Sequence, residues 1–184
     1  MNFLKIFVWA GIFFLILLSG LVYFYKTRPV AVLDSFEKCA AAGNPVMESY
    51  PRQCRAPDGK IFAEYIGNEL ELRDFIKVHE PRPNAMIKSP VIIEGEARGS
   101  WFDGGLMPVR FADDGGDTIV SATARAEGDW KKDNFITFRL EVKYILSEPG
   151  RGLIILDKAN PEHKPASREA LLIPVIFEKS FPAE

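Results

Sequence analysis

Apolar and polar residues alternate along much of the C-terminal part of the chain. The clearest run is 135–144 (FITFRLEVKY), where Ile136, Phe138, Leu140, Val142 and Tyr144 fall on one face and Thr, Arg, Glu and Lys on the other. A period of two with one polar face predicts a β-strand in an antiparallel sheet.

Six further segments have the pattern of short strands, and turns rich in Gly, Asp and Pro separate them. The expected strands are 75–79, 91–97, 106–112, 118–126, 153–158 and 171–178. With 135–144 they predict an all-β fold, an antiparallel β-sandwich of two sheets. Pro108 and Pro174 lie inside two of these strands. Because proline has no backbone N–H, each predicts an edge strand or a β-bulge.

The N-terminus has a different pattern, an uncharged run of twenty residues from Ile6 to Tyr25. As an α-helix at about 1.5 Å per residue, a run of this length spans the hydrocarbon core of a membrane. The apolar region of a signal peptide is shorter, about 7 to 15 residues. We therefore predict an uncleaved single-pass transmembrane helix at residues 6–25, with a cleaved signal peptide as the alternative.

Basic residues flank this run on both sides, so charge alone does not set its orientation. A disulfide after Arg28 would require an oxidising compartment. We therefore predict a protein of the bacterial cell membrane, with a cytoplasmic N-terminus and residues 29–184 extracytoplasmic. Twenty basic and 25 acidic residues follow Arg28, a formal charge of −5. This balance argues against nucleic acid as a partner.

The only two cysteines, Cys39 and Cys54, lie in a short segment of mixed pattern. Asp34 and Glu37 have the spacing of a capping box, so a helix is expected at 35–42, followed by a hairpin. A unit this small needs a covalent cross-link to stay folded. The spacing fits neither C-x-x-C redox chemistry nor a zinc site, which favours a structural disulfide over a redox or metal role.

These patterns divide the chain into four parts. We expect a cytoplasmic stub and transmembrane anchor at 1–28, a two-cysteine module at 29–67, a linker at 68–74 and the sandwich at 75–184.

Two segments resemble known families. The run C-x3-GNPVMESYPRQCR-x-PDGK-x-F, residues 39–62, is similar to a short two-cysteine module of bacterial secreted and lipid-anchored proteins. Residues 75–179 carry Ser89-Pro90, Trp101-Phe102, Gly128-Asp129-Trp130 and a terminal IPVIF, and resemble the immunoglobulin-like domain of bacterial spore-germination proteins, found beside the GerMN module. The resemblance implies an immunoglobulin-like sandwich in the cell envelope and a role in binding or assembly.

Three aromatic residues are candidates for a binding surface. Trp101 and Phe102 follow one expected strand, and Trp130 lies in another loop. Large rigid rings dominate interface energetics, so an exposed cluster could bind a protein or a glycan. The alternative is that the rings close over the core, as buried tryptophans do in such sandwiches.

Motifs for catalysis and ligand chemistry are missing from the sequence. It has no G-x-S-x-G, H-E-x-x-H or phosphate-binding loop. The run DDGGD (113–117) is typical of a hairpin turn and lacks the spacing of a calcium loop. We expect no catalytic residues, no metal and no cofactor.

The resulting hypothesis is a membrane-anchored, non-enzymatic binding or scaffolding protein. Its loops or an edge strand of the sandwich would bind an envelope protein or a cell-wall component. One alternative is a module that binds cell-wall glycan through Trp101, Phe102 and Trp130. A hydrolase of the envelope is the less favoured alternative, because it requires a concave pocket with convergent carboxylates.

Overall fold

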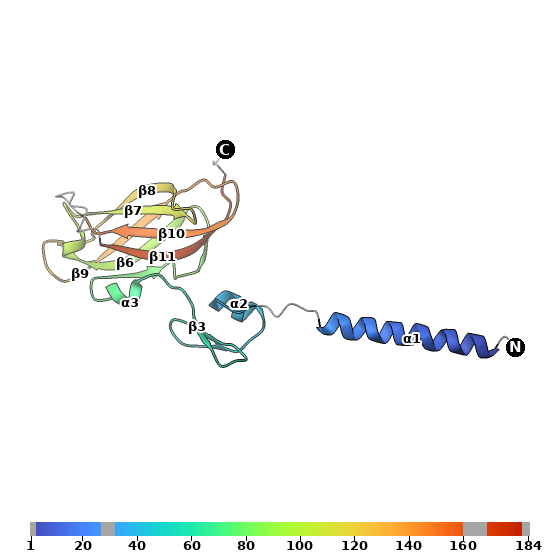
Figure 1. Cartoon of the computed structure of the whole chain (residues 1–184). Helices are drawn as coiled ribbons and strands as arrows, with labels where there is room; N and C mark the ends of the chain where they lie inside the picture. Colours follow the sequence, from blue (N-terminus) through green and yellow to red (C-terminus); the bar gives the residue numbers. More distant parts are fainter. Residues whose placement is uncertain (1–2, 27–31, 160–168, 182–184) are drawn as a thin grey trace. The chain divides into compact units, whose positions relative to one another are not determined.

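A computed structural model describes residues 3–26, 32–159 and 169–181 of the chain (Figure 1). The chain divides into two compact units. One consists of Met1–Glu48 and Arg52–Ala63, the other of Ser49–Pro51 and Glu64–Glu184.

The first unit begins with helix α1, Phe3–Lys26. Within it, the residues whose side chains are described are exposed, and they include Trp9, Phe13 and Leu17. Among the described residues, no helix combines the length and the apolar character needed to cross a membrane. The span expected at residues 6–25 is therefore not shown.

The rest of the first unit is the two-cysteine module. Its elements are α2 (Phe36–Ala41), β1 (Val46–Met47), β2 (Gln53–Arg55) and β3 (Ile61–Ala63), with the strands in the order β1-β2-β3. The expected helix is confirmed, but its N-cap differs from the prediction. Ser35 caps it by accepting a hydrogen bond from the backbone N–H of Lys38 at 3.2 Å. Asp34 instead pairs with the side chain of Lys38 at 2.8 Å.

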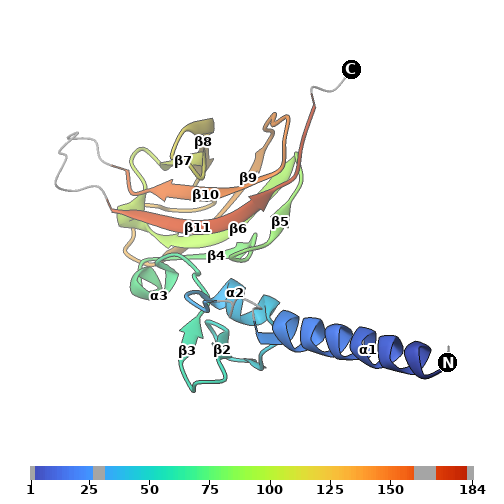
Figure 2. The same ribbon diagram turned by 45° about the vertical axis from the view of Figure 1, so that its right-hand side comes forward.

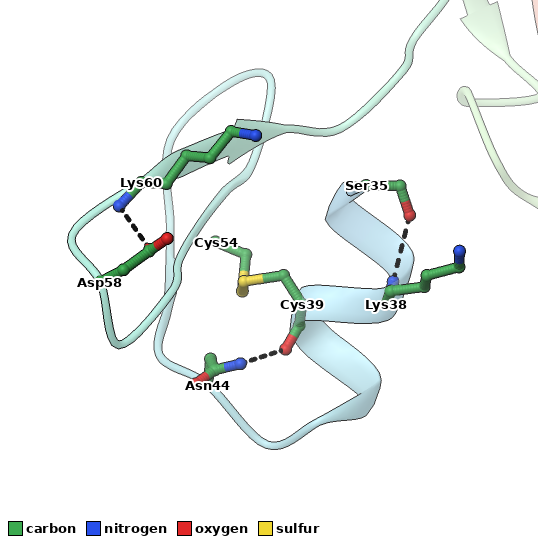
Figure 3. Close-up of a disulfide and its surroundings, with 7 residues drawn as sticks. All are labelled: Ser35, Lys38, Cys39, Asn44, Cys54, Asp58 and Lys60. Carbon is green, nitrogen blue, oxygen red and sulfur yellow. Dashed lines mark hydrogen bonds between the residues drawn. A yellow bond between two sulfur atoms is a disulfide. The ribbon is translucent and has the colours of Figure 1, made fainter. Parts of the chain in front are cut away.

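The expected disulfide joins Cys39 on α2 to Cys54 on β2 (Figure 3). Both cysteines are fully buried and pack with Phe36, Ala56 and Phe62. The bridge therefore lies at the centre of a very small core. This is the position in which a covalent link best compensates for the little apolar surface that so short a unit can bury.

The second unit is the β-sandwich (Figure 2). Its elements are α3 (Glu69–Leu72), β4 (Ile76–Glu80), β5 (Met86–Ile87), β6 (Val91–Arg98), the 3-10 helix η1 (Gly99–Trp101), β7 (Leu106–Asp113), β8 (Thr118–Arg125), β9 (Phe135–Val142), β10 (Gly150–Asp157) and β11 (Ala170–Phe177). The seven strands expected from the sequence are confirmed within a few residues at each end. The two-residue strand β5 was not predicted, because so short a segment has no readable period.

The strands form two sheets, in the orders β5-β11-β10-β7-β8 and β4-β6-β9. Every pairing is antiparallel except that of β5 with β11, which is parallel. Buried side chains from both sheets make one apolar cluster. At its centre Phe111, Tyr144 and Phe177 contact one another, with ring centroids 5.3 to 6.1 Å apart. The chain is thus mostly β, with the core between the sheets.

The two prolines have different outcomes. β11 lies next to the short strand β5, so Pro174 occupies a stretch that has no neighbouring strand on one side, as expected. Around Pro108 the predicted edge is not found, because β7 lies between β10 and β8, but the β7–β8 ladder does have a register shift, between Phe111 and Ala112. Proline is tolerated at position 108 because the pairing of β7 with β10 ends at Val109. No backbone N–H is therefore needed from the next residue, Pro108.

Candidate functional site

The aromatic residues singled out in the sequence lie mostly in the core. Trp101 is 0% exposed and Phe102 is 4% exposed, and both belong to the cluster between the sheets. Phe102 packs edge-on against Phe138 of β9, with ring centroids 6.5 Å apart. These two rings therefore close one end of the core and cannot form an exposed binding face.

Trp130 is half-buried and packs against the same cluster. A Cβ placed on Gly105 would lie 3.2 Å from its ring, so the indole rests against the glycine backbone. The backbone around Trp130 also approaches Gly99, where a Cβ would lie 2.2 Å from the carbonyl oxygen of Trp130. The structure brings the three rings to one end of the sandwich, where they pack as part of the core. The glycan-binding alternative required exposed rings, and this geometry does not supply them.

One polar atom in this region has no partner among the described residues. The indole Nε1 of Trp101 is buried and donates no hydrogen bond there. The backbone carbonyl of Trp101 does accept one, from the N–H of Ala159 at 3.0 Å. An unpaired buried donor costs about 1 to 3 kcal/mol, so the ring is held in place by packing despite its polar group.

The strongest candidate for a binding site is an edge of the larger sheet. The two edges of this sheet differ. Along β11 the outward backbone groups are covered: Pro174 O accepts from Asn84 N–H at 2.7 Å, and Ile176 N–H donates to Ala85 O at 2.9 Å. The Asn68 side chain pairs with the same edge, donating to Ala170 O and accepting from Leu172 N–H. This edge is closed.

Along the opposite edge, formed by β8, the backbone of residues 118–124 lacks such cover within the described residues. Just beyond the strand, Ala126 bridges to Phe138 of β9, and Glu127 N–H donates to Thr137 O at 2.8 Å. The Ala126 N–H donates to Gly105 O at 2.9 Å, so Ala126 and Gly105, at one end of the β7–β8 ladder, are a hydrogen-bonded pair. Pairs alternate along an antiparallel ladder, so the backbone groups of Ser121 and Thr123 point away from β7. Residues 118–124 (TIVSATA) carry no charge and no proline. An uncharged edge of this kind is a template for another strand from Val120 onwards, after the register shift opposite Phe111 and Ala112.

The charged side chains beside this edge form an ion pair. Arg110 of β7 makes two hydrogen bonds to Asp157 of β10, at 2.8 and 3.2 Å. The hydrogen bond from Asp157 raises the pKa of Arg110 above its ordinary value, although burial works in the opposite direction. Arg110 lies opposite Ser121 of β8. Arg110 and Asp157 thus neutralise each other, and the only charged residue of β8 is Arg125 at its C-terminal end.

The remaining features noted in the sequence are structural. Residues 113–117 form the turn of the β7–β8 hairpin, where Asp113 Oδ1 accepts from Asp117 N–H at 2.8 Å.

Sequence reasoning located β8 as a strand but did not identify its edge as a site. Alternating polar and apolar residues show which face of a strand is buried. They do not show which strands lie beside it, because that depends on the order of strands in the sheet.

Comparison with known proteins gives a consistent result for this unit. No curated protein matches the chain. A family model does match, that of the immunoglobulin-like domain of bacterial spore germination, and it covers residues 75–162. This range begins one residue before β4 and extends past β10. A domain of this type suggests a non-enzymatic binding or scaffolding role. Over residues 75–162 the sandwich is therefore similar to the immunoglobulin-like domain of bacterial spore germination, which confirms the resemblance expected from the sequence.

Proposed function

We propose that this chain is a membrane-anchored envelope protein whose sandwich binds another envelope protein by adding a strand at β8. The observation that carries the proposal is the difference between the two edges of the larger sheet. The β11 edge is covered by Asn68, Asn84 and β5, whereas the outward backbone groups of Ser121 and Thr123 on β8 have no such cover within the described residues.

The residues of β8 suit strand addition. Val120, Ala122 and Ala124 face the core, and Ser121 and Thr123 are exposed. An added strand would gain backbone hydrogen bonds from Ser121 and Thr123 without desolvating a charge. Sheet extension of this kind makes affinity depend mainly on the main chain and specificity on small side-chain pockets.

The anchor is the second part of the proposal. We assign residues 6–25 to a single membrane-spanning segment, supported by the twenty uncharged residues and by the exposed apolar side chains of α1. The buried disulfide supports placing residues 29–184 in an oxidising, extracytoplasmic compartment.

The test is photo-cross-linking in intact cells with a photoreactive amino acid at Ser121 of the full chain. We expect a specific adduct with one envelope protein. Thr123→Pro removes an outward N–H and is expected to abolish the adduct, while Thr123→Ala keeps that N–H and the adduct. The same photoreactive residue at Thr137 of β9 serves as the control for proximity. Absence of an adduct at Ser121, or an adduct that survives Thr123→Pro in a folded chain, would overturn strand addition.

A further inference from the structure

An open cavity of about 410 Å³ lies at one end of the three-stranded sheet β4-β6-β9. Its lining consists of Asp74, Phe75, Arg98, Ser100 and Asp133. Phe75 directly precedes β4, Arg98 ends β6, Ser100 belongs to η1 and Asp133 lies in the loop before β9. All five residues are exposed or half-buried. The volume is within the range of roughly 300 to 1,000 Å³ that is typical of small-molecule sites.

Three side chains of this region form a row across the outer face of the sheet. Arg98 is paired with Phe135 of β9, and its backbone N–H donates to Phe75 O at 2.7 Å. The neighbouring core position on each strand is buried, at Ile76, Ala97 and Ile136. Because successive side chains point to opposite faces of a sheet, Phe75, Arg98 and Phe135 face away from the core. The sheet thus presents an arginine between two aromatic rings.

The guanidinium of Arg98 is held by its surroundings. Its Nε donates to Asp74 O at 3.0 Å, and its Nη1 donates to Asp133 O at 3.1 Å. Its Cζ also lies 4.8 Å from the ring centroid of Phe135. Within the described residues, Nη2 donates no hydrogen bond. The cavity therefore contains a positioned donor that a ligand can use.

Two carboxylates line the cavity beside this donor. Asp74 and Asp133 contact Arg98 only through their backbone carbonyls. In the part of the chain that the structure describes, neither carboxylate has a hydrogen-bond or ion-pair partner. An ionised carboxylate only accepts hydrogen bonds, and a guanidinium only donates them. The cavity therefore suits a ligand that both donates and accepts, and two carboxylates against one guanidinium disfavour an anion.

Phe75 supplies the apolar surface of this site. Its side chain is 48% exposed, although its backbone is tied to β6 through Arg98. A flat ring beside polar groups matches a pyranose, whose C–H face packs on an aromatic ring while its hydroxyl groups bond to the surrounding donors and acceptors. The cavity does not involve Trp101, Phe102 or Trp130.

We propose that this cavity binds a neutral saccharide. One pyranose ring stacks on Phe75, its O–H or N–H groups donate to Asp74 and Asp133, and its oxygens accept from Arg98. A peptide fits these groups less well, because the cavity lies on the face of the sheet and offers no open strand edge for a peptide backbone. The site is on the other sheet from β8, and it does not depend on the function proposed above.

Saturation-transfer difference NMR tests this assignment, with the full chain in phosphatidylcholine nanodiscs and triacetylchitotriose as the probe. This neutral trisaccharide carries hydroxyl and amide groups, and nanodiscs avoid detergents with sugar headgroups. We expect saturable binding with a Kd of about 1 mM or tighter. Two comparison ligands should bind at least about tenfold more weakly. Trigalacturonate is anionic, and capped trialanine amide has amide groups but no pyranose face.

Variants of the aromatic ring separate stacking from general adhesion. Phe75→Ala should weaken binding about fivefold or more, because the stacked ring is lost. Phe75→Tyr keeps the ring and should keep the Kd within about twofold of the wild type. The matched control is Phe181→Ala, which removes a ring that is 67% exposed and does not line the cavity. It should leave binding unchanged. Thermal unfolding of each variant checks that the sandwich is folded.

Four results would contradict the proposal. The first is no saturable binding of triacetylchitotriose up to about 10 mM. The second is equal binding of trialanine amide or of trigalacturonate, which would assign the cavity to peptides or to anions. The third is equal weakening by Phe75→Ala and Phe181→Ala, which would indicate non-specific contact with exposed rings. The fourth is loss of binding in a folded Phe75→Tyr variant, because the stacking surface is then still present.

Discussion

The side chain of Asn68 pairs with Leu172 as a neighbouring strand would. Its Oδ1 accepts from the Leu172 N–H at 2.8 Å, and its Nδ2 donates to Ala170 O at 2.9 Å. One amide thus satisfies a donor and an acceptor on the edge of β11. The preceding residue, Gly67, has φ +78°, and a Cβ there would lie 1.8 Å from Leu172 O. Glycine is therefore required for the chain to approach the strand this closely.

Replacing Asn68 should uncover this part of the edge. We expect Asn68→Ala to lower the free energy of unfolding by about 1 to 3 kcal/mol, because it leaves Leu172 N–H and Ala170 O without their partner. Asn68→Asp should cost a similar amount, since its carboxylate cannot donate to Ala170 O. Denaturant unfolding measures both. The control is Asn134→Ala, which loses only a local bond to Phe135 O and should change stability by less than about 0.5 kcal/mol. Equal effects at the two positions would contradict the pairing.

Removal of the disulfide should affect the two-cysteine module alone. The bridge closes a sequence separation of 15 residues, and loop closure of this size is worth about 3 kcal/mol. In the variant Cys39→Ala with Cys54→Ala, we expect hydrogen exchange to accelerate in α2, β2 and β3. Exchange in β6, β7 and β10 should not change, because those strands have their own core. Retained protection in the module would show that its few apolar contacts suffice.

Substitutions of Trp101 distinguish a core ring from a surface ring. We expect Trp101→Ala to destabilise the chain by about 3 to 5 kcal/mol, because it leaves a large cavity between the sheets. Trp101→Phe should cost much less, since it keeps most of the ring and removes the buried donor Nε1. Thermal unfolding measures the difference. An alanine variant with an unchanged melting temperature would show that the ring is exposed.

Tyr144 should make stability depend on alkaline pH. Its hydroxyl donates to Ile87 O at 2.7 Å and lies 3.2 Å from Glu178 O. Burial raises the pKa of Tyr144 above its ordinary value of 10.0, although the hydrogen bond to Glu178 works against this. The folded state therefore holds this proton more tightly than the unfolded state does. The resulting stabilisation is present below pH 10 and is lost as the pH rises through the folded-state pKa.

The matched variant is Tyr144→Phe. Near neutral pH we expect it to cost about 0.5 to 1.5 kcal/mol, because the hydrogen bonds of the hydroxyl are lost while Ile87 O still accepts from Glu178 N–H at 3.0 Å. Above pH 10 the difference between the wild type and the variant should shrink. Urea unfolding at several pH values measures this difference. A gap that stays constant would mean that the hydroxyl is not shielded from water in the folded state.

Much of the second unit could be read from the sequence because strand formation depends on local alternation. The run 135–144 shows one apolar face, and β9 has that face in the core. The disulfide was predictable because so small a unit needs a covalent cross-link, and the cysteine spacing fitted neither a C-x-x-C redox motif nor a zinc site. The family resemblance rested on short motifs of consecutive residues, and the family model matches residues 75–162 of the same domain.

Other features depended on contacts between residues far apart in the chain. Trp101 is 0% exposed because η1 places its ring between the sheets. The sequence of a loop does not show whether a Trp or Phe side chain points into the core or into solvent. Pro108 indicated an edge or a bulge, and β7 is an internal strand whose ladder with β10 ends one residue away, at Val109. The pairing of the Asn68 amide with β11 has no signal in the local pattern.

Local patterns were enough to identify the segments that become strands, the cysteines that pair and the family that the sandwich resembles. Each of these follows from the period, the spacing or the composition of a short stretch. The covered and open edges of the larger sheet, and the burial of Trp101 and Phe102, became visible only in the folded chain. These properties arise where segments separated by many residues come together, and the order of strands that brings them together is set by packing of the whole core.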